Sequence, residues 1–365
     1  MDRITFPRGG EFYQALKQRV DDYFLKNQKS RTGNWKMYVK TAIILLWLVS
    51  SYTVLVFFSG SFWIALISAF ALAQAFVMVG FNIMHDANHG SYSQRKGINR
   101  FMGWSLDLIG GSSHMWRQKH NVLHHTYTNV DSLDDDIDTG GMLRLSPHQP
   151  WKPWHRFQRL YVFPLYSLLT LYWLTYTDFK KLFTGRIGSH SMPATNTWDQ
   201  TFFFLTKIFY FSYTLLIPMF FHPVLYVLLT FLAVHMVTGI TMAVVFQLAH
   251  TTPANEFPEA NLQSGKLPND WAVHQVRTTA DFAPNNPLAT WYLGGLNYQI
   301  EHHLFSKVCH VHYPALSRIV QKTCEDFDLE YNRYPTIREA LAAHWSFLGR
   351  MARRPHVRTA MSLAG

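Results

Sequence analysis

Residues 41–84 read TAIILLWLVSSYTVLVFFSGSFWIALISAFALAQAFVMVGFNIM, and this stretch contains no Asp, Glu, Lys or Arg. A helix needs about 20 apolar residues to cross the hydrocarbon layer of a membrane, so the stretch has room for two spans. Ser59-Gly60-Ser61 is the expected turn between them. The pattern therefore predicts a helical hairpin inside a membrane.

A second uncharged stretch covers residues 208–255 and also has room for two spans. Pro218 and Pro223 mark the expected break between them. Lys207, near the start, is expected to extend its ammonium group to the membrane interface. The sequence thus predicts an all-α integral membrane protein built from two hairpins. The four expected spans lie near residues 40–58, 62–84, 201–220 and 223–248.

Composition agrees with this class of protein. Charged residues make up 15% of the chain, whereas soluble domains carry roughly 25%. The two cysteines provide neither a disulfide framework nor a zinc motif. The net charge of +10 favours contact with anionic lipid headgroups. No dense run of Lys or Arg indicates a nucleic-acid partner.

The distribution of basic residues predicts the orientation in the membrane. Nine Lys and Arg residues precede the first span, whereas the two expected turns carry none. The positive-inside rule then places residues 1–39, 85–200 and 251–365 in the cytoplasm. Within the last of these, residues 346–365 are expected to form a basic tail.

Three histidine motifs stand out in the cytoplasmic segments: HDANH at 85–89, HNVLHH at 120–125 and QIEHH at 299–303. Spacings of three or four residues place side chains on one face of a helix. Imidazole suits iron, zinc, copper and nickel. A single zinc uses three or four protein ligands, so seven imidazoles indicate two metal ions. The seven are His85, His89, His120, His124, His125, His302 and His303.

These motifs, in this order, resemble the three histidine boxes of the membrane fatty acid desaturases, and the likeness covers roughly residues 40–345. Gln299 is similar to the first residue of the third box in the front-end subgroup, which acts between an existing double bond and the carboxyl end. Bacterial members are the most similar. The resemblance implies an O₂-dependent desaturase of the bacterial inner membrane. It would introduce a cis double bond into a fatty acyl chain at a di-iron centre held by a cytoplasmic helical cap.

The resemblance implies one further ligand, a histidine at the cytoplasmic end of the last span. His250 fits, and the second and fourth spans would then both end inside, at His85 and His250. His235 is the competing candidate. It lies 15 residues earlier, or roughly 22 Å along a straight helix, so one centre cannot use both. We interpret His235 as a packed or cavity-lining residue.

Residues near the boxes are candidates for orienting the ligands, because a metal-bound imidazole usually donates its other N–H to a carboxylate or carbonyl. The acidic run from Asp131 to Asp138 is either such a set or a solvated loop. The candidates inside or beside the boxes are Gln299, Asp86, Asn88, Asn121, Asn297, Glu301 and His274. Gln299 is also a possible weak ligand.

The expected partners follow from the resemblance. The acyl substrate would be linked to CoA, lipid or carrier protein and would enter a narrow apolar tunnel past the metals. Residues before the first span are too few for a fused cytochrome b5 domain, and no His-Pro-Gly-Gly haem motif occurs. Electrons are therefore expected from a separate ferredoxin or cytochrome b5.

Two alternatives remain at this point. A di-iron membrane hydroxylase or alkane monooxygenase would carry the same boxes but leave oxygen in its product. A histidine-rich membrane metal transporter would need ionisable residues along a path through the spans, and these spans offer only His222, His235 and a few amides.

Residues 160–177 are uncharged and nearly long enough to cross the membrane. The second box precedes this segment, whereas His250 and the third box follow it. A crossing here would place the third box across a roughly 30 Å hydrocarbon layer from the second. We therefore predict that residues 158–183 lie on the cytoplasmic membrane surface.

Overall fold

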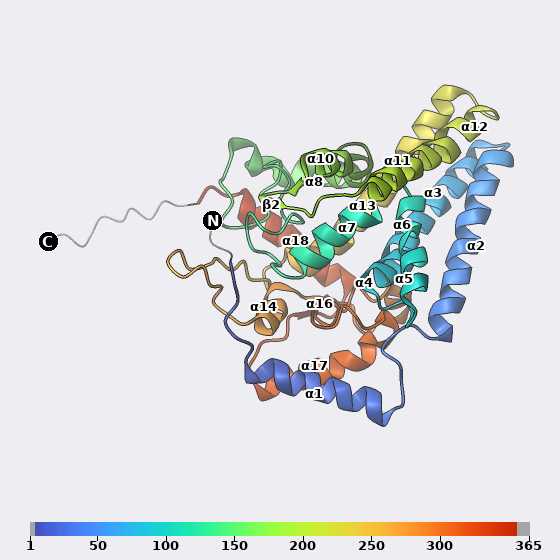
Figure 1. Ribbon diagram of the computed structural model, residues 1–365. Coiled ribbons are helices and arrows are strands. Elements are labelled where there is room, and N and C mark those ends of the chain that lie inside the picture. Colours follow the sequence, from blue (N-terminus) through green and yellow to red (C-terminus); the bar gives the residue numbers. More distant parts are fainter. Residues whose placement is uncertain (1–3, 356–365) are drawn as a thin grey trace.

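The computed structural model describes residues 4–355 and is mostly helical (Figure 1). Among these residues, four helices are long and apolar enough to span a membrane. The first hairpin is α2 (Trp35–Phe57) followed by a continuous helix made of α3 (Phe62–Met78), η1 (Val79–Met84) and α4 (His85–His89). The second is the helix of α11 (Thr197–Phe211), η5 (Ser212–Leu216) and α12 (Ile217–Met219), followed by α13 (Val224–His250).

Local capping explains where the first hairpin begins and turns. The side chain of Asn34 accepts a hydrogen bond from the Lys36 backbone N–H, so α2 begins five residues before the expected residue 40. The Ser61 hydroxyl accepts from the Ile64 N–H in the same way at the start of α3. Such caps satisfy backbone donors that the first helical turn leaves free.

The segment predicted at 158–183 forms short helices rather than one long one. α8 (Gln158–Ser167), α9 (Leu169–Tyr172), η4 (Trp173–Thr177) and α10 (Asp178–Thr184) follow one another, and both α8 and α9 pack against α13. Pro164 lies inside α8, where it removes a backbone donor. The segment is absent from the four candidate spans found among the described residues.

A cap of short helices covers one end of the hairpins (Figure 1). Helix α1 (Glu11–Lys26) packs on α17 (Tyr313–Asp326) and α14 (Trp271–Thr278) through buried apolar side chains such as Leu16 and Leu316. The larger cap helices are α14 (Trp271–Thr278), α15 (Pro287–Tyr292), α16 (Gln299–Leu304), α17 (Tyr313–Asp326) and α18 (Ile337–Ala352). The shorter elements are α5 (Lys96–Gly103), α6 (Ser105–Leu108), α7 (Ser113–Trp116), η2 (Arg117–His124), η3 (Pro153–Phe157) and η6 (His310–His312).

The prediction of an all-α fold needs a small correction. Two sheets occur among the described residues, each made of two strands of two residues. In one, β1 (Arg186–Ile187) pairs antiparallel with β2 (His190–Ser191), and Arg186 lies opposite Ser191. In the other, β3 (Asp281–Phe282) pairs in parallel with β4 (Arg333–Tyr334). The second sheet joins the segment before the third box to the segment before α18.

The expected domain boundaries shift at both ends. Residues 1–39 include the start of α2, and α18 continues to Ala352, beyond the predicted limit at residue 345. Phe347 and Leu348 are buried, and Gln158 Nε2 donates to the Leu348 carbonyl at 2.8 Å. Residues 346–352 are therefore part of the packed fold rather than of a basic tail. The remainder of that tail, from residue 356, lies outside the described residues.

Lys207 is buried, contrary to the expectation that its ammonium extends to the membrane interface. Its Nζ donates to Asp178 Oδ2 at 2.9 Å and to the Gly110 carbonyl at 2.6 Å. The side chain therefore joins α11 to α10 and to the loop after α6. A buried charge needs such partners, because moving an unpaired charge out of water costs free energy.

Candidate metal centre

The three boxes and the end of α13 meet in one place. The first box forms α4, the second lies on η2 and the residue after it, and the third lies on α16. All eight predicted ligands are buried, with at most 8% of any residue exposed. They are His85, His89, His120, His124, His125, His250, His302 and His303.

Two of these helices have a π-helical segment at the site. η1 immediately precedes His85. η2 carries His120 and His124, and the His125 N–H donates to the His120 carbonyl, five residues back. π-helical turns are rare and are frequently found at functional sites. Here they set the direction in which the first two boxes point.

The histidines form two adjoining groups. Side-chain nitrogens of the first group lie within 4.8 Å of one another, and so do those of the second. His125 lies between the groups, with its ring centroid 4.6 Å from that of His302 and 4.3 Å from that of His303. The first group is His85, His89, His120 and His302, and the second is His124, His250 and His303.

The ring nitrogens of these groups suit metal ions. Buried polar atoms almost always have a hydrogen-bond partner. Several buried nitrogens here have none: both of His85, Nε2 of His89, His302 and His303, and Nδ1 of His125 and His250. Metal ions in the two groups would use such lone pairs. The donor set therefore fits two metals, and an all-imidazole set suits iron.

Burial also favours the neutral, metal-binding form of the imidazoles. Desolvation and neighbouring imidazoles hold the pKa of His120, His125, His302 and His303 well below the ordinary value. Burial also lowers the pKa of His124, but the carboxylates of Asp134 and Asp136 together outweigh burial, so the net pKa is raised. Metal binding requires deprotonated ligands.

Contacts outside the groups orient the rings. His124 Nδ1 lies 3.0 Å from Asp134 Oδ1, within the acidic run, and 3.3 Å from Asp136 Oδ2. His302 Nδ1 lies 3.1 Å from the Tyr313 hydroxyl. His303 Nδ1 lies 2.8 Å from Gln275 Oε1. Each contact leaves the opposite nitrogen, Nε2, directed at its group.

Gln299 is the candidate beside the boxes that lies closest to a predicted ligand. Its Nε2 lies 2.9 Å from His250 Nε2. Asp86 is farther away, with Oδ1 at 3.9 Å from His85 Nδ1, whereas Asp86 Oδ2 accepts from His310 Nδ1 at 2.8 Å. Asp86 is therefore hydrogen-bonded to His310 but not to His85.

The other candidates for orienting ligands make contacts elsewhere. Asn88 Nδ2 donates to the Gly103 carbonyl, Asn121 Nδ2 to the Asn88 carbonyl and Asn297 Nδ2 to the Ala283 carbonyl. Glu301 accepts from the Tyr331 hydroxyl, and His274 packs edge-on against Phe6. Their role in orienting the ligands stays a prediction, because Glu301 Oε2 and both ring nitrogens of His274 are buried without a hydrogen-bond partner among the described residues. Gln275 and Tyr313 were missed because no spacing within the boxes indicates them.

A series of cavities leads from the cap into the helices. A groove of about 420 Å³, the entrance groove, lies between α8–α10 and α13. It meets a cavity beside the histidines at Lys119, Asp136 and Trp173. That cavity shares His85 and His120 with a mainly apolar one, the inner cavity, which extends between α3 and α13. The site is thus open to an elongated apolar molecule.

Comparisons with known proteins agree with this geometry. The family model described as fatty acid desaturase matches residues 61–335. An sn-1 linoleoyl-lipid 6-desaturase of Synechocystis is 37% identical over 96% of this chain and 98% of its own length. The protein of the same name from Arthrospira platensis is 38% identical over 98% and 96%. An acyl-lipid (8-3)-desaturase of Physcomitrium patens is 40% identical over 93% and 71%.

The third box begins with Gln299, as expected for the front-end subgroup. With the matches to the whole histidine-bearing region, this makes the chain a front-end member of the fatty acid desaturase family.

Proposed function

We propose that this desaturase acts on lipid-linked acyl chains and uses O₂ at a di-iron centre held by the eight histidines. The observation that carries the proposal is the pair of buried histidine groups with unpartnered nitrogens, next to an apolar cavity. The relatives' names, which specify acyl-lipid substrates, support the lipid linkage.

Iron ions bound here would supply the oxidising power needed to break two unactivated C–H bonds. The overall reaction consumes O₂, two electrons and two protons, removes two hydrogens from adjacent carbons and releases two water molecules. Side chains of the inner cavity, such as Phe81 and Met84, would hold the acyl chain beside His85 and His120. Their apolar surfaces keep bulk water from the reacting carbons.

The entrance groove gives the acyl carrier a place to bind. Leu165, Leu168 and Tyr172 line its apolar side, and Lys180 and Arg186 lie at its rim. An acyl chain entering here passes Trp173 before it reaches the histidines. This arrangement suits a lipid whose headgroup remains at the membrane surface.

The membrane topology is also a proposal. The four long helices would span the bacterial inner membrane, and α8–α10 would lie on its cytoplasmic surface with the histidines and both termini. Tyr172, Tyr176 and Leu160 are exposed, as suits a segment at the lipid headgroups. We expect a cysteine introduced at Lys180 to react only with a reagent supplied from the cytoplasm. If a membrane-impermeant reagent labelled this cysteine in intact cells, position 180 would lie outside the cell. That result would contradict a metal centre shared by all three boxes.

Product analysis tests the function directly. In a host fed a defined dienoic fatty acid, we expect a new cis double bond between the existing ones and the carboxyl end. The product should weigh two hydrogens less than its precursor. A product that gains one oxygen would indicate a hydroxylase, and iron uptake without a new lipid would indicate a transporter. With purified protein, supplying reduced ferredoxin or reduced cytochrome b5 identifies the separate electron donor.

A further inference from the structure

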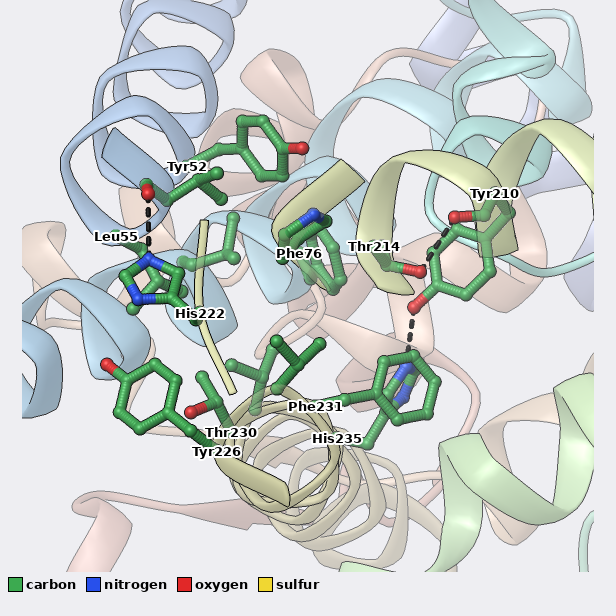
Figure 2. A pocket seen from close by; sticks show the side chains of 15 residues that line it. Tyr52, Leu55, Phe76, Tyr210, Thr214, His222, Tyr226, Thr230, Phe231 and His235 are labelled. Atoms are coloured by element: carbon green, nitrogen blue, oxygen red, sulfur yellow. Dashed lines mark hydrogen bonds between the residues drawn. The ribbon is translucent and has the colours of Figure 1, made fainter. Parts of the chain in front are cut away.

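A further cavity lies beyond the inner cavity, and we call it the far cavity (Figure 2). It lies between α2, α3, the α11–α12 helix and α13, and includes Leu72, Val227 and Phe231 among its apolar lining. The two cavities share only Phe76 and His235 as lining residues. These two side chains therefore stand at the boundary between the cavities.

Tyr210 completes this boundary. Its hydroxyl lies 2.5 Å from His235 Nε2, as the dashed line in Figure 2 shows. The ring is fully buried and lies close to Gly110, where an added Cβ would approach Tyr210 to 2.9 Å. Because Gly110 lines the inner cavity, the Tyr210 ring fills the space between that loop and the far cavity.

The boundary is held by a complete set of hydrogen bonds. If the Tyr210 hydroxyl donates to His235 Nε2, the N–H at Nδ1 can donate to Thr170 Oγ1 at 3.0 Å. The Thr170 hydroxyl then donates to the His235 carbonyl at 3.0 Å. Every polar hydrogen in this chain of three residues has an acceptor. In a surrounding of low polarity such bonds are strong, and breaking one is costly.

The position of the boundary matches the end of an acyl chain. Phe76 precedes His85 by nine residues on one continuous helix, which corresponds to roughly 13 Å. Its ring centroid lies 6.4 Å from that of His235, so the two rings are neighbours. The methyl end of a chain that reacts beside His85 would therefore reach this level.

We propose that Tyr210 and His235 form a partition that stops the methyl end of the acyl chain and so limits the chain length the enzyme accepts. This inference rests on the proposed function. The far cavity is apolar enough to take further methylenes, but the closed partition separates it from the substrate. A hydrocarbon pocket that differs from its ligand by one methylene discriminates by at least roughly tenfold.

The test compares two fatty acids with identical double bonds counted from the carboxyl end, one longer by two methylenes at the methyl end. Tyr210→Ala opens the partition, and we expect the conversion of the longer acid relative to the shorter to rise roughly tenfold. Tyr213→Ala is the matched control. It removes a tyrosine from the same helix that lines neither cavity. Because the Tyr213 ring packs against Tyr210 at 5.5 Å, Phe209→Ala serves as a second control. It removes an exposed ring of this helix that also lines neither cavity, and its ratio should stay as in the wild type.

A second substitution closes the space again. Thr230 lines the far cavity and not the inner one (Figure 2). Thr230→Phe alone should leave the ratio unchanged, whereas in Tyr210→Ala it should return the ratio to the wild-type value. If Tyr210→Ala does not accumulate, Phe76→Leu opens the same boundary with a smaller loss of volume.

The partition would be refuted if Tyr210→Ala or Phe76→Leu converted the shorter acid but left the conversion of the longer acid relative to the shorter as in the wild type. A lowered ratio in Thr230→Phe alone would also refute it, because the far cavity would then already hold substrate. Failure of the wild type to desaturate either acid would instead count against the proposed function.

Discussion

His124→Ala is expected to abolish desaturation while the protein still accumulates in membranes. The His124 ring lies between His250 and Asp134, with its centroid 4.7 Å from that of His250. Alanine removes a ligand from the smaller histidine group, which has only three members. Loss of a residue that merely orients a ligand costs 10- to 100-fold in metal affinity or activity, so loss of the ligand itself should exceed roughly 100-fold.

A graded variant separates metal binding from general damage. Asp134→Asn keeps the shape of the side chain but weakens the contact with His124 Nδ1, and we expect iron affinity to fall roughly 10- to 100-fold. Asp131→Asn is the control, because Asp131 belongs to the same acidic run but lines neither the entrance groove nor the cavities that follow it. Iron content of the purified proteins and product yield are measured together. Full iron content and turnover in His124→Ala would refute the assignment.

Lys207→Met is expected to destabilise the protein by about 3 kcal/mol or more, because removing one partner of a buried ion pair leaves the other charge uncompensated. Asp178 is buried and would lose the ammonium at 2.9 Å. Burial by itself raises the pKa of Asp178. The loss of stability is measured as a lower midpoint temperature of thermal unfolding in detergent. The folded fraction that remains after heating is read from size-exclusion chromatography.

The double variant Lys207→Met/Asp178→Leu distinguishes the ion pair from lost packing. Replacing both partners by apolar residues of similar volume is often neutral, so we expect most of the stability to return. Lys180→Met is the matched control, since Lys180 is exposed on the same helix as Asp178. An unchanged midpoint in Lys207→Met, or no recovery in the double variant, would refute the importance of the pair.

The long helices and the histidine motifs could be predicted because both are local patterns. Hydropathy over some 20 residues decides whether a segment can span a membrane. A spacing of three or four residues decides which histidines share a helix face. The prediction that residues 160–177 are not one long span depended on a different argument, the need for all boxes to reach one centre, and the segment is divided into α8, α9 and η4.

Contacts between distant segments could not be predicted. Gln275 reaches His303 from α14, and Asp178 reaches Lys207 across 29 residues, and no periodicity connects either pair. Asn88 and Asn297 are candidates because they lie inside or beside a box, and no spacing indicates that their side chains donate to the carbonyls of Gly103 and Ala283. The end of the fold was misplaced because the basic composition of 346–365 obscured two apolar residues, Phe347 and Leu348.

The π-helical segments η1 and η2 have a consequence for how the gene can change. A π turn contains one residue more than an α turn, so each segment behaves like a single-codon insertion in an ordinary helix. Deleting one codon among residues 117–119 would keep every histidine, and the π turn can absorb the deletion by returning to α geometry. The helix beyond the deletion would then keep its direction. In related genes, a one-residue gap at this place should therefore be tolerated, whereas a further one-residue insertion would rotate the following side chains by roughly 100°.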